Sequence, residues 1–326
     1  MKHIIEANLA PTSSLVTVDE NSDGQRLDNF LMRELKGVPK THVYRIIRSG
    51  EVRINKGRVQ ADTRVHAGDV VRLPPVRVSD KITEKLDHPA PARQFPILLE
   101  DDHLIALDKP AGVAVHGGSG VSFGVIEQLR RARPQAKFLE LVHRLDRETS
   151  GILLVAKKRS ALINLQDQFR ERETGKTYLA LVVGVWPANK KVLDKPLVKF
   201  LLPSKDGQEG ERRVKVTSKD DPEGMKSVTL VKVAQKSERF TLLEVTIKTG
   251  RTHQIRVHLA SEGFPIAGDD KYGDFEINKT LQKQGLKRMF LHAWRLQFNH
   301  PATHERVELL AELPSDLGQI STLYNK

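Results

Sequence analysis

The residues with the clearest capacity for chemistry lie around one carboxylate. Residues 143–151 read His-Arg-Leu-Asp-Arg-Glu-Thr-Ser-Gly, which places Asp146 in a turn between apolar segments. A carboxylate can act as a nucleophile or as a base that removes a proton. In a turn, however, an aspartate more often holds the loop or caps a helix, and here it could cap Thr149 or Ser150. The neighbouring motifs have to decide between the catalytic and the structural reading.

Three more clusters combine reactive residues with glycine, proline or basic neighbours. Tyr178 could stack on a flat ring and help to move a proton, although a tyrosine in a strand more often belongs to the core. Arg256 could fix a carboxylate by two parallel hydrogen bonds, although it could equally bind phosphate, a role that suits Arg251 better. The clusters are residues 107–112 (Leu-Asp-Lys-Pro-Ala-Gly), 176–180 (Lys-Thr-Tyr-Leu-Ala) and 250–258 (Gly-Arg-Thr-His-Gln-Ile-Arg-Val-His).

Two short motifs are more typical of structural turns than of reactive sites. The Lys-Pro-Ala-Gly of residues 109–112 combines a fixed turn at the proline with close backbone approach at the glycine. Tyr272 competes with Tyr178 for an active-site role, but it falls in a Gly-Asp-Asp-Lys-Tyr-Gly segment that is typical of a turn.

Several other kinds of site lack support. The chain has no cysteine, which excludes disulfides, thiolate zinc sites and a cysteine nucleophile. We expect no metal, because His253 and His258 are five residues apart and do not share the face of a zinc-binding helix. The glycine-rich residues 116–120 lack the Lys-Ser/Thr of a phosphate-binding loop, and no Gly-x-Ser-x-Gly motif indicates a serine hydrolase. Asp146 and Glu148 would point to opposite faces of an extended segment, which disfavours a glycosidase pair.

Charge and hydropathy bear on partners and location. The net charge of +12 favours a polyanionic partner, and nucleic acid is the polyanion that we expect. No apolar run approaches the roughly 20 residues that span a bilayer. The first residues lack the apolar core and cleavage site of a signal peptide. We therefore expect a cytoplasmic protein with no membrane partner.

The positive charge is concentrated near the N-terminus. Residues 24–75 hold eleven Lys or Arg and five Asp or Glu, a net charge of +6, which is half of the total. Apolar spacing predicts a helix over residues 26–35 and a second over residues 41–49, capped by its first residue. Short strands are expected over residues 52–55 and 70–73. The basic residues that we expect to contact RNA from this unit are Lys40, Arg45, Arg48, Arg53 and Lys56.

These patterns predict four segments. Residues 1–15 show no pattern and are expected to be a flexible tail, followed by a compact unit over residues 16–76. Residues 77–95 are charged and contain two prolines, which is typical of a linker. A larger domain is expected over residues 96–326, in which the polar residues 190–226 form an insertion or hairpin.

Within the larger domain, Arg256 falls in a predicted helix that Thr252 can cap and Gly263 can end. An amphipathic helix is predicted around Leu162, Leu165 and Phe169. The predicted strands cover residues 97–99, 104–107, 152–156, 178–185, 228–233 and 240–247.

The four clusters, in their order along the chain, resemble the large-subunit ribosomal RNA branch of the pseudouridine synthases. The N-terminal unit resembles the RNA-binding domain named after ribosomal protein S4. The resemblance implies an α+β fold, in which a mixed, mainly antiparallel sheet with flanking helices and a central RNA cleft forms the catalytic domain, beside a small α/β S4-like domain. Residues 114–120 and 138–142 look most like a subgroup designated C, whose members isomerise uridines at several sites of 23S rRNA.

The resemblance also implies roles for single residues. Asp146 matches the catalytic aspartate of the family, Arg256 an arginine that pairs with it, and Tyr178 an active-site tyrosine. Arg144 matches an arginine that holds the target base flipped out of the RNA, and a phosphate contact is its alternative. We further expect RNA contacts from His143, Arg251 and His253.

The family needs no metal and no cofactor for its reaction, and we expect none here. The expected partner is 23S rRNA or a large-subunit assembly intermediate, and we expect a monomer. The alternative from another class is a non-catalytic RNA-binding assembly factor. Such a factor would not need Asp146, Tyr178 and Arg256 together, so their joint presence favours the enzyme.

Overall fold

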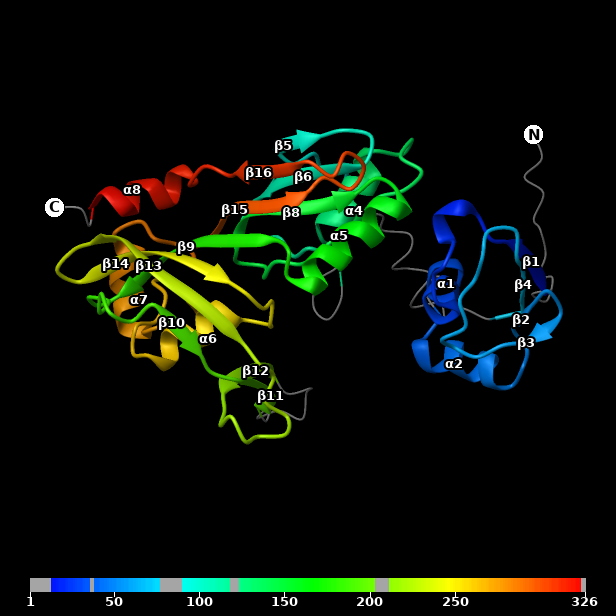
Figure 1. The fold of residues 1–326 in the computed structure, drawn as a ribbon, viewed down its shortest axis with the longest axis horizontal. Helices are drawn as coiled ribbons and strands as arrows, with labels where there is room; N and C mark the ends of the chain where they lie inside the picture. Colours follow the sequence, from blue (N-terminus) through cyan, green and yellow to red (C-terminus); the bar gives the residue numbers. More distant parts are fainter. Residues whose placement is uncertain (1–12, 36–37, 77–89, 118–122, 203–210, 324–326) are drawn as a thin grey trace, which may run out of the picture. The chain divides into compact units, whose positions relative to one another are not determined.

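The computed structural model describes residues 13–35, 38–76, 90–117, 123–202 and 211–323. The chain divides into two compact units, Met1–Pro91 and Ala92–Lys326, which Figure 1 colours from blue to cyan and from cyan to red. None of the described helices is long and apolar enough to cross a membrane. Residues 1–12 of the expected tail and residues 77–89 of the expected linker lie outside the described residues.

The first unit packs two helices against a small antiparallel sheet with the strand order β1-β4-β2-β3. Ser14 of β1 pairs with Leu73 of β4, so regular structure begins inside the segment that we expected to be a tail. The four residues of β1 are too few to show the alternation that predicts a strand, and they form one because they pair with β4, far along the chain. The elements are β1 (Ser14–Thr17), the 3₁₀ helix η1 (Glu20–Ser22), α1 (Leu27–Glu34), α2 (Lys40–Arg48), β2 (Arg53–Ile54), β3 (Gly57–Arg58) and β4 (Val70–Leu73).

The predicted inner face of α2 is confirmed, because Val43, Ile46 and Ile47 are all buried in the core of this unit. The predicted cap is wrong. The N-cap residue is Pro39, whose carbonyl oxygen accepts hydrogen bonds from the backbone of His42 at 2.9 Å and Val43 at 3.1 Å. The φ of Pro39 is −57°, so the ring prepares the chain for a helix without a side-chain cap.

The second unit is built on one mixed sheet. In the part of the chain that the structure describes, its strands follow the order β10-β13-β14-β9-β15-β8-β6-β5, with β16 beside β15 and β7 beside β8. Strands β8 and β15 are parallel, and the other neighbouring pairs are antiparallel, which confirms the expected mixed, mainly antiparallel sheet. A separate hairpin, β11–β12, fills part of the polar segment 190–226, whose residues 203–210 lie outside the described ranges.

The strands of this unit are β5 (Ile97–Glu100), β6 (Leu104–Lys109), β7 (Glu140–Leu141), β8 (Ser150–Ala156), β9 (Gly175–Val183), β10 (Val192–Asp194), β11 (Leu197–Leu202), β12 (Glu211–Val216), β13 (Val228–Lys236), β14 (Phe240–Ile247), β15 (Leu291–Asn299) and β16 (Arg306–Leu310). Its helices are α4 (Val125–Ala132), α5 (Arg159–Glu171), α6 (Gln254–Ser261), α7 (Phe275–Lys283) and α8 (Ser315–Leu323).

Helices cover both faces of the sheet, so its central strands are apolar on both sides. In β8, Ile152 and Leu154 pack with α5, whereas Leu153 and Val155 pack with α4 on the other face. Side chains alternate across a strand, which explains why all seven residues of β8 are buried. Farther along the sheet, α6 packs against one face of β9 and β14, while α7 and α8 pack against the other.

The junction of β8 and β15 leaves no room for a side chain. Gly151 of β8 pairs with Ala293 of β15 and has a φ of +108°. A Cβ atom at this position would lie 2.3 Å from the carbonyl oxygen of Ala293. This close approach joins the loop that carries Asp146 to the strand next to β9, so it bears directly on the geometry of the site.

We expect Gly151→Ala to destabilise the protein by roughly 1–3 kcal/mol or more, because it adds backbone strain to a clash between two central strands. Urea unfolding followed by circular dichroism measures the change in the free energy of unfolding. Gly318→Ala in α8 is the matched control, since nothing lies within 4 Å of its added Cβ and alanine favours a helix. Equal stability of the two variants would contradict the argument.

Candidate active site

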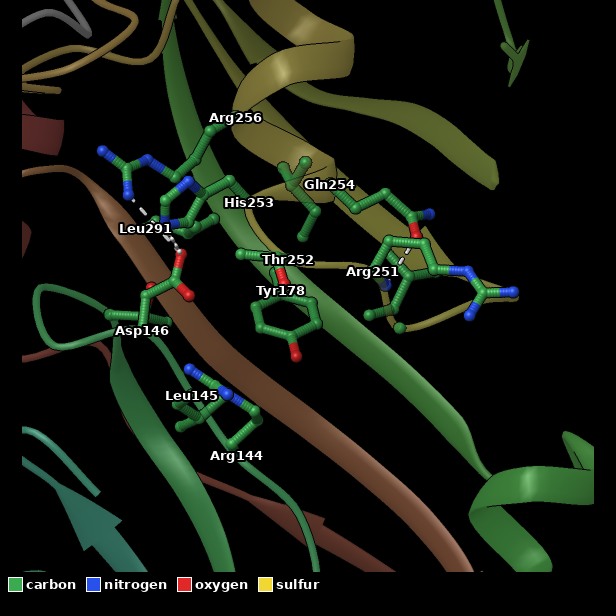
Figure 2. Close-up of a pocket in the computed structure, with 14 residues that line it drawn as sticks. Arg144, Leu145, Asp146, Tyr178, Arg251, Thr252, His253, Gln254, Arg256 and Leu291 are labelled. Atoms are coloured by element: carbon green, nitrogen blue, oxygen red, sulfur yellow. Dashed lines mark hydrogen bonds and ion pairs between the residues drawn. The ribbon is translucent and has the colours of Figure 1, made fainter. Parts of the chain in front are cut away.

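Asp146 lies in the loop between β7 and β8, and its carboxylate faces the start of α6. The carboxylate oxygen Oδ2 is 3.5 Å from Nη1 of Arg256 and 3.9 Å from Nε2 of His253. Thr149 donates its backbone N–H to the backbone carbonyl of Asp146 at 3.1 Å, so the turn is closed without the carboxylate. Figure 2 shows the side chain turned toward Arg256 and His253. The side chain is therefore available for chemistry and is not used as a cap.

Lys109, at the end of β6, holds this loop in place through hydrogen bonds to its backbone. It is fully buried, and its ammonium donates hydrogen bonds to the carbonyl oxygens of Pro110 and Val113 at 2.8 Å and of Arg147 at 3.1 Å. Burial lowers the pKa of Lys109 to about 7, against the opposing effect of the charges of Glu148 and Asp146. The Lys-Pro-Ala-Gly segment thus holds the residue that follows Asp146, which agrees with its expected structural role.

Arg256 projects from α6 and is held by a buried carboxylate. Its Nε and Nη2 atoms donate to the two oxygens of Asp269 at 2.8 and 2.6 Å, and Nη2 also reaches Asp270 at 3.3 Å. The side chains of Arg256 and Asp269 are 3% and 1% exposed. Burial alone would raise the pKa of Asp269, but the hydrogen bonds and charge of Arg256 outweigh it and hold that pKa below its ordinary value. This bidentate pair leaves Nη1 of Arg256 to face Asp146.

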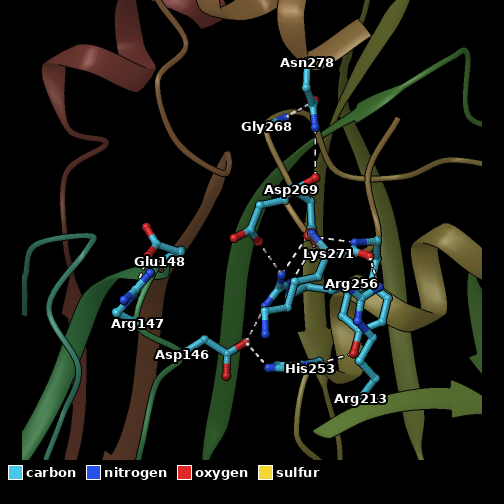
Figure 3. Close-up of polar contacts among 12 residues, drawn as sticks. Asp146, Arg147, Glu148, Arg213, His253, Arg256, Gly268, Asp269, Lys271 and Asn278 are labelled. Carbon is cyan, nitrogen blue, oxygen red and sulfur yellow. Dashed lines mark hydrogen bonds and ion pairs between the residues drawn. The ribbon is translucent and has the colours of Figure 1, made fainter. Parts of the chain in front are cut away.

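Asp269 is itself fixed by the turn that we read as structural. Its Oδ1 accepts the backbone N–H groups of Lys271 at 2.8 Å and Tyr272 at 3.0 Å. Asn278 of α7 accepts from the N–H of Gly268 and donates to the carbonyl of Asp269, as Figure 3 shows. Our sequence analysis missed Asp269 as a partner of Arg256. The available signal was an Asp-Asp pair inside a turn bounded by two glycines.

The start of α6 also differs from the prediction. The N-cap residue is His253, in a left-handed conformation with φ of 52°, and not Thr252. The side chain of Gln254 organises this corner: it accepts from the N–H of Arg251 at 3.1 Å and donates to the carbonyl of Val228 at 3.0 Å. The helix ends before Gly263, whose φ of +85° fits the predicted end.

Tyr178 projects from β9 into the same pocket. Figure 2 shows its ring among the lining residues, with Thr252 and Arg144 on either side of it. Burial raises the pKa of Tyr178, and the negative charge of Asp146 raises it further. The hydroxyl therefore stays protonated at neutral pH and can donate a hydrogen bond.

Two hollows meet at Asp146. The first has a volume of about 110 Å³ and the second about 400 Å³, and Arg144, Asp146, His253 and Arg256 line both. Tyr178 and Arg251 border the first, while His116 and Lys271 border the second. Within the described ranges, no group of three or more His, Asp or Glu side chains is placed to hold a metal ion.

The residues predicted to contact RNA near Asp146 fall into two groups. Arg144 and Arg251 are exposed at the pocket, and Arg144 forms no ion pair with any residue that the structure describes. His143, in contrast, accepts a hydrogen bond from the backbone of Leu154 at 3.1 Å and stacks on Phe169. Burial lowers the pKa of His143 to about 4, so its ring is neutral and serves internal packing. We now expect no phosphate contact from His143.

The five basic residues of the first unit that the sequence predicted to contact RNA are all exposed to solvent. Beside them lies a groove of about 920 Å³ with an apolar floor that includes Ile47 and Val59. Tyr44 and Arg58 line this groove together with Arg48, and sequence analysis missed the first two. The exposed set predicted from the sequence is Lys40, Arg45, Arg48, Arg53 and Lys56.

Comparisons with known proteins agree with this architecture. The model of the RNA pseudouridylate synthase family matches residues 103–261, and the S4 domain model matches residues 25–71. The ribosomal large subunit pseudouridine synthase C of Yersinia pestis is 52% identical over 311 residues, covering 94% of each chain. Its namesake from Escherichia coli strain K12 is 50% identical over 313 residues, covering 94% of this chain and 95% of the relative.

Among solved structures, the human RNA pseudouridylate synthase domain containing 4 superposes with a TM-score of 0.55 at 30% identity. The match covers 68% of this chain and 90% of the human chain. The chain therefore belongs to the RNA pseudouridylate synthase family and carries an S4 domain ahead of the catalytic domain. Pseudouridine synthases are isomerases, and the protein is an enzyme of that class.

We expect Arg256→Lys to lower the rate constant of pseudouridine formation by about 10- to 100-fold, because lysine keeps the charge but cannot bind Asp269 and face Asp146 with one planar fork. Single-turnover kinetics with saturating enzyme measures the effect. Arg251→Lys, at an exposed arginine of the same pocket, should keep the rate constant near the wild-type value. A wild-type rate constant for Arg256→Lys would show that the fork is not needed.

Proposed function

We propose that this protein isomerises uridines to pseudouridines in 23S ribosomal RNA, with Asp146 as the catalytic residue. The observation that carries the proposal is the carboxylate of Asp146, which lies where two hollows meet and faces the buried Arg256, in a chain of this family. The curated relatives are named as ribosomal large subunit enzymes, which supports the choice of RNA.

The reaction is balanced within the nucleoside. The bond from C1′ to N1 breaks, the base turns, and a bond from C1′ to C5 forms. C5 loses a proton and N1 gains one, so no electron donor, acceptor or energy source is consumed. A site for this reaction has to hold the base after it is cut free, stabilise charge on the sugar or base, and move protons.

The contacts of Asp146 fit each of three chemical routes. The carboxylate can attack the sugar, add to the base, or remove a sugar proton. In every case Arg256 orients it from one side. Tyr178 offers a flat ring for stacking and, as a neutral phenol, a proton that it can donate.

The size of the hollows supports a flipped nucleotide. The hollow beside Tyr178 has a volume of about 110 Å³, which suits a single pyrimidine ring. A base that is stacked inside RNA can enter it only after it has been flipped out of the stack. The neighbouring hollow of about 400 Å³ can take the sugar and its phosphate. In this proposal Arg144, which borders both, holds the extruded nucleotide in place.

The S4 domain supplies affinity in this proposal. Lys40, Arg45 and Arg48 of α2 are exposed and can neutralise phosphates. Tyr44, which is 37% exposed, can stack on an unpaired base in the groove between Arg48 and Arg58. The proposal also includes a monomer that acts in the cytoplasm, either on 23S rRNA or on a large-subunit assembly intermediate.

The sequence left a non-catalytic assembly factor as the alternative, which the family assignment disfavours. Such a factor would use the same basic surface, but it gives no reason for Arg256 and Asp269 to be buried together beside a hollow that Tyr178 lines. The two functions differ in what a single isosteric change at Asp146 should do.

We expect Asp146→Asn to abolish the modification while leaving RNA binding intact, because the amide keeps the shape but is neither a nucleophile nor a base. Pseudouridine mapping of 23S rRNA, from cells that lack the protein and from cells that carry only Asp146→Asn, measures this. Both strains should lack the same modifications.

Three other outcomes are informative. Sites lost in the null strain but kept with Asp146→Asn would preserve the enzyme and remove Asp146 as its catalytic residue. A map unchanged in both strains would favour the assembly factor or another RNA. The null strain could also show a defect in ribosome assembly that is absent from the Asp146→Asn strain, while both strains lack the modifications. That result would separate a role in assembly from the catalytic role.

We expect the triple variant Lys40→Ala, Arg45→Ala, Arg48→Ala to bind RNA more weakly and with a shallower dependence on salt. The slope of log K against log salt is negative, and each lost phosphate contact reduces its magnitude by about 1. Fluorescence anisotropy with a 23S rRNA fragment over a salt series measures the slope. A control with the same charge change replaces the exposed Lys279, Lys283 and Lys287 in and after α7. Equal slopes for the two variants would show that the S4 domain makes no phosphate contact.

A further inference from the structure

Tyr272 lies at the centre of a series of polar contacts that leads from β12 through His253 to the proposed catalytic carboxylate. The backbone N–H of Val214, in β12, donates to the hydroxyl oxygen of Tyr272 at 3.1 Å. On its other side the hydroxyl is 2.9 Å from Nδ1 of His253. The hydroxyl has one proton to donate, and a backbone N–H cannot accept it. Among the described residues, Nδ1 of His253 is the acceptor within reach of that proton, so the tautomer that uses it has an unprotonated Nδ1.

The imidazole of His253 is neutral at neutral pH. Burial lowers its pKa; Asp146 and Asp269 act against this, and the positive charges of Arg256 and Lys271 add to it. A neutral imidazole has one donor nitrogen and one acceptor nitrogen. Because Nδ1 accepts, the proton sits on Nε2. This is the nitrogen that faces Oδ2 of Asp146 at 3.9 Å.

We propose that His253 is a positioning residue for Asp146, with its Nε2–H directed at the carboxylate, and that Tyr272 and the backbone of β12 fix this tautomer. The inference rests on the proposed function, because it takes Asp146 as the reacting group. It assigns His253 to the chemical centre, whereas the sequence suggested an RNA contact.

The surroundings of the ring support this role. The side chain of His253 is 14% exposed, and a neutral imidazole offers a phosphate no charge. Its backbone is held in the left-handed region at the start of α6, and its ring meets that of Tyr272 edge to face at 5.5 Å. The guanidinium of Arg256 lies over the same tyrosine ring at 5.1 Å. Tyr272 therefore contacts both partners of Asp146.

The present distance of 3.9 Å is longer than a hydrogen bond. Catalytic hydrogen bonds are often long without substrate and tighten in the complex. Closure to hydrogen-bond distance needs a displacement of about 1 Å. Arg256 and His253 would then hold the same carboxylate oxygen from two directions, so the other oxygen is left for the nucleotide.

The β11–β12 hairpin becomes part of the site through this chain of contacts. Arg213 of β12 also donates to the carbonyl of Lys271 at 2.9 Å, next to Tyr272. The position of the hairpin thus sets the orientation of Tyr272, and Tyr272 sets the tautomer of His253. A hairpin distant in sequence from Asp146 controls how that carboxylate is held.

Two substitutions at His253 separate the roles of its nitrogens. The amide nitrogen of glutamine can occupy the place of Nε2, whereas asparagine reaches only the place of Nδ1. We expect His253→Gln to keep the single-turnover rate constant within about threefold, and His253→Asn to lower it by about 10- to 100-fold, the worth of one hydrogen bond to a charged group. Asparagine adopts the left-handed conformation readily, so the second variant should fold and bind RNA as the wild type does.

The tautomer is measured directly by nitrogen NMR of the full-length protein with ¹⁵N-labelled histidine. We expect the wild type to show a protonated Nε2 and an unprotonated Nδ1 for His253, assigned with the His253→Gln variant. Tyr272→Phe keeps the ring over Arg256 but removes the hydroxyl. It should convert His253 to a mixture of tautomers and lower the rate constant with no change in RNA affinity.

A protonated Nδ1 in the wild-type spectrum would overturn the proposal, and so would a wild-type rate constant for His253→Asn. These results are distinct from failure of the proposed function. If Asp146→Asn is inactive while His253→Asn is fully active, the assignment of Asp146 stands and the role of His253 falls. If Asp146→Asn keeps full activity, the proposed function of Asp146 falls whatever the tautomer of His253.

Discussion

The buried pair of Arg256 and Asp269 is the interaction on which the rest of the site depends. Taking both charges out of water costs several kcal/mol per ion, and only full hydrogen bonding offsets that cost. Asp269 accepts two hydrogen bonds from Arg256 and two from the backbone of its own turn, so both of its carboxylate oxygens are hydrogen-bonded. The guanidinium is therefore held in one orientation. Its remaining nitrogen points at Asp146 before any substrate arrives, which lowers the reorganisation that the reaction requires.

Asp146 has to meet this fixed arginine from a loop, and the structure limits the freedom of that loop from two sides. The ammonium of Lys109 binds three carbonyl oxygens, one of which belongs to the residue after Asp146. Beyond the loop, Gly151 brings β8 into close contact with β15, the strand that separates β8 from β9 and its Tyr178. A reactive residue on a loop thereby gains the precision of a residue on the sheet.

Much of this could be predicted from the sequence, because the relevant signals were local. Apolar patterns predicted the inner face of α2 and the strands of residues 104–107 and 152–156, and short motifs indicated Asp146, Tyr178 and Arg256. Asp269, Tyr272 and Val214 were not predicted as parts of the site, because their roles arise from contacts between segments far apart in the chain. The cap of α6 was wrong for a related reason: Gln254 bonds to β13 and leaves the N-cap position to His253.

The chain places its charges in two different environments, and each suits a different task. Beside Asp146, the guanidinium of Arg256 is paired with Asp269 and shielded from water, which makes its field strong and directional. On the S4 domain, Lys40 and Arg48 are exposed, so they attract phosphate over a distance set by salt and without fixed geometry. A cation cannot serve well in both ways, because the burial that sharpens its direction also removes it from the RNA backbone. This conflict gives a physical reason for a separate basic domain: affinity can be gained there without disturbing the balance of charge that orients Asp146.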